Sequence, residues 1–199
     1  MAKKLHHPLR VGRALVLGLV LSACAAEQEP AYYLLAARAD AGAEASPQST
    51  AKGVIGLREL AMPLYVRRTQ IASVGPDGAV SLSDDHRWAE ETPRSASRVV
   101  ARALSGLTGR PVVIEPWPIG VEPEFRVDIE VDYFAGRLGG ELRFEGQYRI
   151  VPASGAPGIT NTFALTETSA GPGYDALVES HRHALEALTR IIAAQVPGQ

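Results

Sequence analysis

A pair of alternating segments between residues 124 and 151 constrains the fold of this chain more than any other feature. In each segment an apolar side chain is followed by a charged or polar one, and Gly139 and Gly140 separate the two. Successive side chains of a β-strand point to opposite faces, so the pattern predicts a hairpin with one buried and one solvated face. The expected inward residues are Phe125, Val127, Ile129, Val131 and Tyr133 on the first strand, and Leu142, Phe144, Tyr148 and Ile150 on the second.

The numbering of these two inward sets restricts the connection between the strands. The first set is odd-numbered and the second is even-numbered. Directly paired residues must therefore sum to an odd number, which requires a loop with an even number of residues. A β-bulge in either strand would reset this parity.

Two further segments have the spacing of apolar residues, three or four apart, that indicates an amphipathic helix. The first helix is expected to start with Thr92 as a cap and Pro93 in the first turn, and to stop at Gly109. The second is expected to start after Pro172–Gly173 and to end at Pro197–Gly198. The apolar stripes are Ala96, Val99, Val100, Ala103, Leu104 and Leu107, and Leu177, Val178, His181, Ala184, Leu185, Leu188, Ile191 and Ile192.

The remaining segments complete the predicted fold. The turn signal Gly75-Pro76-Asp77-Gly78 predicts a hairpin over residues 70–82, while residues 39–52 lack periodicity and predict a loop. Residues 84–87 are expected to form a polar turn before the first helix. The order of elements predicts an α+β fold in which an antiparallel sheet carries two main helices packed on one face. Further short strands are expected at residues 32–35, 53–60, 112–114 and 162–166.

Cys24 is the only cysteine of the chain and determines how the N-terminus is interpreted. Basic residues without any acid precede an apolar run over residues 14–20, and Leu21-Ser22-Ala23-Cys24 follows. This order is typical of a secretory signal peptide, and the apolar run is too short for a bilayer span, which needs about 20 residues. The last four residues resemble the lipobox of bacterial lipoproteins. The resemblance implies cleavage before Cys24 and acylation of Cys24, where each buried methylene adds about 0.8 kcal/mol of anchoring.

The chain is therefore expected to consist of a lipoprotein signal peptide (1–23), a lipidated tether (24–30) and one domain (31–199). The residues between the cysteine and the domain reach at most about 20 Å, which keeps the domain close to the membrane. Asp after the cysteine retains lipoproteins at the inner membrane in the sorting rule familiar from enteric bacteria. Because residue 25 is Ala, we expect the inner leaflet of the outer membrane, facing the periplasm. The alternative is an ordinary secreted protein whose cysteine stands there by chance.

Composition excludes several classes of partner. Cleavage before Cys24 leaves 176 residues with 16 basic and 22 acidic side chains, a net charge of −6. This acidic balance argues against nucleic acid as a partner and against a polybasic grip on anionic lipid. The length predicts one domain, and no disulfide can form within one mature chain, because its only thiol would carry lipid.

No motif predicts catalysis, a metal site or a cofactor other than the covalent lipid on Cys24. His181 and His183 are two positions apart on a helix and point in different directions, so they suit zinc poorly. We expect His181 in the core with a hydrogen-bond partner, and His183 on the solvated face. A lipid hydrolase is disfavoured because no G-x-S-x-G elbow is present, and no glycine-rich nucleotide loop occurs either.

Two tryptophans border the expected helices and strands. Trp117 stands between two prolines, so it is either a contact anchor for a partner or a side chain that packs under its own loop. Trp88 precedes the first helix and is expected to pack against its first turn.

Several short segments, in their order and spacing, resemble one known family. Val54-Ile55-Gly56-Leu57, followed by Met62-Pro63-Leu64-Tyr65-Val66-Arg67-Arg68-Thr69-Gln70-Ile71, is similar to a signature with a strand, a proline, a tyrosine, a basic residue and a glutamine. Arg87-Trp88-Ala89-Glu90 matches a tryptophan before the first helix, and Tyr32-Tyr33-Leu34-Leu35 fits the start of the domain. The chain thus resembles the PqiC/YmbA family of ABC-type transport auxiliary lipoproteins over most of its mature length. It departs from the family at Arg67, where members often carry an acid.

The resemblance implies a function and partners. Such lipoproteins are the outer-membrane component of MCE systems, which move phospholipids or other hydrophobic molecules across the periplasm with an ABC permease and ATPase. The lipoprotein docks the MCE protein at the outer membrane, and related proteins assemble into rings, so a homo-oligomer is implied. The candidate contacts are Pro63, Tyr65, Arg67, Gln70 and Ile71, together with exposed sheet edges. The alternative is a structural or envelope-assembly lipoprotein unrelated to transport.

Overall fold

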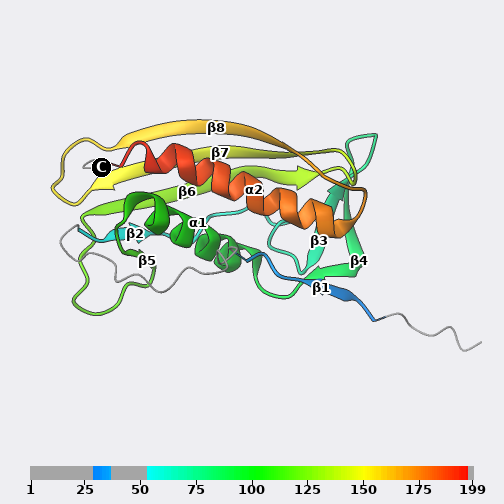
Figure 1. Ribbon diagram of the computed structural model, residues 1–199, viewed down its shortest axis with the longest axis horizontal. Helices are drawn as coiled ribbons and strands as arrows, with labels where there is room; N and C mark the ends of the chain where they lie inside the picture. Colours follow the sequence, from blue (N-terminus) through cyan, green and yellow to red (C-terminus); the bar gives the residue numbers. More distant parts are fainter. Residues whose placement is uncertain (1–28, 37–52, 197–199) are drawn as a thin grey trace, which may run out of the picture.

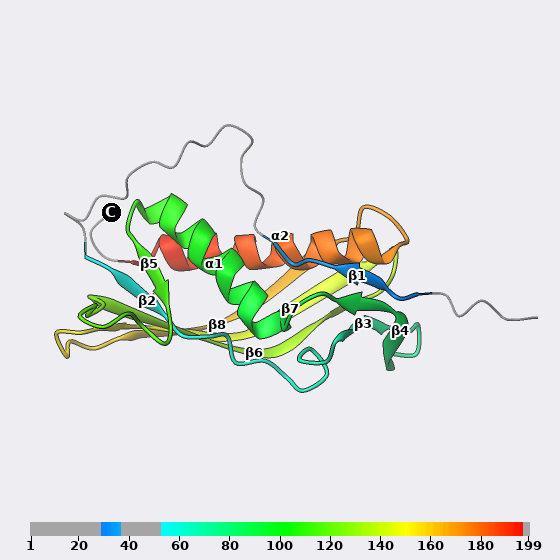
Figure 2. The same ribbon diagram turned by 90° about the horizontal axis from the view of Figure 1, so that it is seen from below.

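Both helices of the described chain lie on the same face of one eight-stranded sheet. The computed structural model describes residues 29–36 and 53–196, and Figure 2 shows the two helices above the sheet. The predicted α+β class and the placement of the helices are therefore confirmed. Cys24 and the loop expected at residues 39–52 lie outside the described residues, as does the end of the second helix expected at Pro197–Gly198.

The elements follow the order that the sequence predicts (Figure 1). Neither helix within the described ranges is long and apolar enough to cross a membrane. Along the chain the elements are β1 (Ala31–Tyr33), β2 (Ile55–Leu57), β3 (Gln70–Val74), β4 (Val80–Trp88), α1 (Thr92–Thr108), β5 (Val112–Ile114), β6 (Phe125–Gly136), β7 (Glu141–Pro152), β8 (Ile159–Thr168) and α2 (Tyr174–Ala193).

The sheet is mixed, whereas the sequence predicted an antiparallel one. Strands β6, β7 and β8 form an antiparallel meander, and β3 and β4 form the predicted hairpin. On its other side, β6 pairs in parallel with β2 at its start and with β3 at its end. Strand β5 then extends the sheet beside β2, and β1 extends it beside β4, both in parallel. These parallel pairs join segments far apart in sequence, so no turn signal announces them.

The β6–β7 hairpin contains a β-bulge, one of the two ways in which the odd-numbered and even-numbered inward residues could be brought to one face. From Phe125↔Pro152 to Val131↔Gly146 the paired numbers sum to an odd value, as predicted. The register then shifts between Val131 and Tyr133. Beyond the shift it is Phe134 that faces the core, with its ring centroid 4.3 Å from that of Phe144. Tyr133, predicted to point inward, is only half-buried.

Three local predictions around the first helix need correction. Residues 84–87 belong to β4, which is largely exposed on both faces and therefore lacks alternation. Thr92 is the first helical residue, and Glu91 occupies the N-cap position without a side-chain cap. Leu107 is 48% exposed although it continues the apolar spacing. The helix stops where predicted, since Gly109 adopts φ 65° and donates its N–H to the Ser105 carbonyl.

The core lies between the helices and the sheet. Trp88 is buried there, and its ring meets the His181 ring edge-on at 5.5 Å between centroids. His181 is buried as predicted, with Nδ1 2.8 Å from the Leu177 carbonyl, while His183 is exposed. The largest fully buried side chains are Tyr148, Phe134, Phe144, Ile55, Leu57, Leu60, Ile71, Leu104, Leu142, Ile150, Leu177 and Leu185.

Candidate partner-binding site

The segment between β2 and β3 forms a turn that is fixed to the core at one residue. The N–H groups of Val66 and Arg67 both donate to the Pro63 carbonyl, over 3.1 and 3.2 Å. Val66 is 4% exposed and holds the turn against the core, whereas Leu64 is 66% exposed and Arg67 is exposed as well. The turn therefore presents one aliphatic and one cationic side chain on a backbone of defined shape.

Tyr65 joins this turn to the bulged strand β6. Its hydroxyl oxygen accepts the backbone N–H of Phe134 over 2.8 Å, and its ring lies 6.3 Å from the Tyr133 ring. Burial raises the pKa of Tyr65, and the hydrogen bond from Phe134 opposes that effect in part. The hydroxyl satisfies a backbone donor just after the bulge, so Tyr65 has a structural role in the domain itself.

The five predicted contact residues do not share one surface. Gln70 and Ile71 are neighbours on β3, so their side chains point to opposite faces. Ile71 is fully buried in the core and offers no surface to a partner, which corrects its assignment as a contact. Gln70 is half-buried, with its amide 3.4 Å from Asp84 Oδ1. The accessible part of the candidate site is therefore Pro63, Arg67 and Gln70.

Arg67 borders a hollow of mixed charge. Among residues 29–36 and 53–196, no ion pair involves Arg67. Its guanidinium can therefore donate hydrogen bonds to a carboxylate of a partner. Glu59 and Glu91 also line the hollow, and Glu59 lies 3.8 Å from Arg94, so a carboxylate brought by a partner is expected to pair with Arg67. The hollow has a volume of about 350 Å³ and is lined by Glu59, Leu60, Ala61, Met62, Arg67, Glu91 and Pro93.

The candidate segment 63–71 also contains Leu64 and Arg68, two exposed side chains that the sequence did not single out as contacts. Leu64 stands between Pro63 and Tyr65 in an apolar run. In a strand or a helix, the regular spacing of apolar residues would separate the buried side chains from the exposed ones. A turn has no such period, so only the structure separates exposed Leu64 from buried Val66.

Two sheet edges complete the accessible features. Strand β8 pairs only with β7 within the described chain, and Glu167 is its one charged residue. The pairing of β4 with β1 begins at His86, so the first part of β4 is also open, with Val80 and Leu82 about two-fifths exposed. Open edges present unpaired N–H and C=O groups that can receive another strand. Charged side chains, proline and bulges, which blunt such edges, are nearly absent from β8.

Trp117, which the sequence left as either a partner contact or a packed side chain, packs against the domain itself. Trp117 is half-buried, and a Cβ built on Gly56 would lie 2.9 Å from its ring, so the indole packs on β2. No cluster of three or more histidine, cysteine or acidic side chains suited to a metal ion occurs in the described parts of the chain.

A family model described as the ABC-type transport auxiliary lipoprotein component matches residues 33–193. The chain belongs to this family. The family predicted from the sequence is thereby confirmed, and the match extends from the end of β1 to the end of α2. It includes the turn around Arg67 and the open edges of β4 and β8. A comparison with curated protein sequences finds no match.

Solved structures share the fold of this auxiliary lipoprotein. An uncharacterized protein aligns with a TM-score of 0.69 at 17% identity, over 84% of this chain and 99% of its own. Protein XCC0632 from Xanthomonas campestris, assigned to family DUF330, aligns with a TM-score of 0.60 at 15% identity, over 83% of this chain and 91% of its own. At these identities the likeness concerns the fold alone.

Proposed function

We propose that this chain is an outer-membrane lipoprotein that serves as the non-catalytic auxiliary component of an MCE/ABC-type transport system. In this role it docks the periplasmic MCE protein at the outer membrane, while an ABC permease and ATPase act at the inner membrane. The cargo is a phospholipid or another hydrophobic molecule. The observation that carries the proposal is the family match over residues 33–193.

The physical requirements of such transport support this role. An acyl chain exposed to water costs about 0.8 kcal/mol per methylene, so passage between two membranes needs a shielded conduit held near both. A lipid on Cys24 followed by a short tether gives the domain a high local concentration at one membrane. Because the mature chain is acidic overall, its net charge does not attract it to nucleic acid or to anionic lipid surfaces.

We assign the contact with the MCE protein to the turn that presents Leu64 and Arg67, with Gln70 beside it. Leu64 offers an apolar anchor and Arg67 a cation, both on a turn that Val66 and Tyr65 hold in place. The open edges of β4 and β8 are assigned to strand pairing, either with the MCE protein or with further copies of this chain in a ring.

A cross-linking pull-down tests the proposal. The tagged, lipidated full chain is recovered from its native envelope, and co-purifying proteins are identified by mass spectrometry. We expect an MCE protein together with its permease and ATPase. Recovery of envelope-assembly or peptidoglycan-associated proteins in their place would refute the transport role and favour the structural alternative.

A matched pair of variants tests the assigned contact. Arg67→Gln and Arg126→Gln each remove one exposed positive charge, the first in the turn and the second on the outer face of β6. We expect Arg67→Gln to weaken MCE binding by about tenfold to a hundredfold, and to lower recovery accordingly, because a charge-assisted contact contributes roughly 1.5–3 kcal/mol. Arg126→Gln should leave recovery unchanged. Equal recovery with both variants would remove the turn from the interface.

A further inference from the structure

A hollow of about 420 Å³ lies beside α1, between that helix, the end of β5 and the residues that follow β1. This volume falls within the range of about 300–1,000 Å³ that is usual for small-molecule sites. Its apolar lining is Leu34, Leu35, Ala36, Ala101 and Ile114, and its polar lining is Glu90, Arg98 and Arg102.

The apolar side chains form the floor and the mouth of this hollow. Leu35 and Ala101 are buried, at 5% and 8% exposure, and Ile114 is half-buried beside them. Leu34 stands at the mouth with 61% of its surface exposed. An exposed leucine next to a buried apolar floor suits a flexible hydrocarbon chain, which gains free energy from each methylene that it removes from water.

Among the described residues of the polar lining, two arginines face one glutamate, which leaves one positive charge in excess. Helix α1 carries Arg94, Arg98 and Arg102 four residues apart, hence on one face, and has no acidic residue. Arg94 is held outside the hollow by Glu59 at 3.8 Å and by the Glu115 carbonyl at 3.1 Å.

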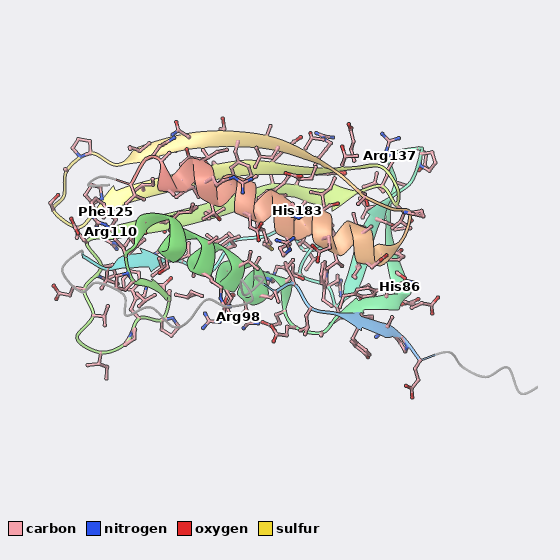
Figure 3. The ribbon with its side chains drawn as sticks, in the orientation of Figure 1. His86, Arg98, Arg110, Phe125, Arg137 and His183 are labelled. Carbon is pink, nitrogen blue, oxygen red and sulfur yellow. The ribbon has the colours of Figure 1, made fainter. Side chains whose placement is uncertain are left out.

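Arg98 and Arg102 remain at the rim, where Figure 3 marks Arg98 on α1. Arg98 pairs with Glu90. Arg102 is exposed and has no ion pair within the described ranges. One guanidinium above an apolar floor complements a single anionic head group.

We propose that this hollow binds one acyl chain whose anionic head group, a carboxylate or a phosphate, pairs with Arg102. The position in the chain agrees with such a ligand, because Leu34 lies ten residues after Cys24. That length reaches at most about 35 Å, so the site stays near the membrane to which the predicted anchor attaches. The inference goes beyond the docking role and does not depend on it, since the ligand needs no transporter to bind.

Photolabelling in vesicles tests this site. The lipidated full chain is reconstituted into vesicles of phosphatidylethanolamine and phosphatidylglycerol, without any transporter. A palmitate analogue with a diazirine on its chain is added below saturation and irradiated, and labelled peptides are mapped by mass spectrometry. We expect labelling of the peptides that contain Leu34 and Ala101, and its suppression by excess palmitate. An uncharged palmityl alcohol carrying the same diazirine should label these peptides about tenfold less.

Variants separate the charge from the cavity. Arg102→Gln should reduce the labelling about tenfold, while Arg126→Gln should leave it unchanged. Ala101→Trp fills the hollow and should abolish the labelling. Leu34→Asp places an acid at the mouth of the hollow and should also abolish the labelling. Because Leu34 is exposed, this variant should keep the thermal unfolding midpoint of the wild type. The test therefore does not depend on whether the Ala101→Trp variant folds.

Three results would overturn the proposal. The first is equal labelling of the wild-type and Arg102→Gln chains. The second is label confined to other surfaces, such as the β8 edge. The third is labelling of the Cys24→Ser chain but not of the lipidated chain, because the protein's own acyl group would then occupy the hollow. None of these results depends on the MCE partner, so failure here leaves the pull-down result untouched.

Discussion

At the scale of single residues, His181 is a titratable side chain that the fold uses as a core residue. It is 3% exposed, and its ring lies edge-on to Phe134 and Trp88 at 4.6 and 5.5 Å between centroids. A carbonyl oxygen only accepts, so Nδ1 carries the proton that it donates to Leu177, and the neutral ring is the Nδ1–H tautomer. Burial lowers the pKa of His181 to about 4, and the hydrogen bond to Leu177 opposes this shift in part.

This lowered pKa predicts a loss of stability in acid. The unfolded chain has a histidine pKa of about 6.5, so it binds the proton first, and protonation favours unfolding. The contribution of neutral His181 is therefore complete above about pH 6.5 and lost as the pH falls to about 4. We expect the free energy of unfolding to drop by up to about 3 kcal/mol more in the wild type than in His181→Phe. Urea titrations between pH 4 and 7 measure this difference.

An exposed histidine provides the control for that measurement. His183→Gln changes the neighbouring exposed histidine and should keep the full acid dependence of the wild type. If His181→Phe and the wild type lost stability in parallel, the acid dependence would belong to other groups.

Tyr65 gives a second residue-scale prediction. Tyr65→Phe removes the acceptor for the Phe134 N–H and leaves that donor without a partner beside the bulge. We expect a loss of about 1–3 kcal/mol in the free energy of unfolding, measured by urea titration. Tyr32→Phe, on an exposed tyrosine of β1, should change it by less than about 0.5 kcal/mol. Because Tyr65 supports the fold, Arg67 is the better residue for testing partner binding.

At the scale of elements, two glycines should respond to alanine with opposite signs. A Cβ on Gly146 would lie 2.1 Å from the Glu130 carbonyl oxygen, opposite the bulge of β6. Apart from the helix's own backbone, no atom of the described chain lies within 4 Å of a Cβ on Gly106, which is exposed in the last turn of α1. We expect Gly146→Ala to cost about 2–3 kcal/mol through overpacking. Gly106→Ala should stabilise the chain by about 1 kcal/mol, because alanine favours a helix. Thermal unfolding midpoints that move in the same direction would contradict this account.

The elements that the sequence predicts well are those with a strong local period. The β6–β7 hairpin alternates between one wet and one buried face, so its inward residues follow from the pattern up to Val131. Parity allowed either an even loop or a bulge, and only the structure shows that a bulge is present and turns Phe134 inward in place of Tyr133. Residues 84–87 were misassigned because β4 is exposed on both sides and has no alternation to detect. Leu107 fits the helical period but is 48% exposed, which no local pattern reports.

At the scale of the whole molecule, prediction fails where distant segments meet. The parallel pairs β2–β6 and β3–β6 join strands that other elements separate in the sequence, so no local pattern announces them. The segment around Pro63 could be located from its family signature, but its exposed side chains could not be identified. The hollow beside α1 is lined by the residues that follow β1, by the end of β5 and by α1, so no single segment contains its signature.

The proposed attachment of the whole molecule to a membrane rests on Cys24, and the proposed sorting to the outer membrane rests on the residue after it. We expect the wild-type chain to incorporate radiolabelled palmitate and to sediment with outer-membrane fractions on a sucrose gradient. Cys24→Ala removes the thiol that takes the lipid, so the variant should incorporate no palmitate and retain its uncleaved N-terminus. Ala25→Asp keeps the thiol but creates the retention signal of enteric bacteria, and should move the labelled protein to inner-membrane fractions. If the labelled Ala25→Asp protein stayed in outer-membrane fractions, this host would sort lipoproteins by a different rule. Incorporation of palmitate into the Cys24→Ala chain would refute Cys24 as the anchor.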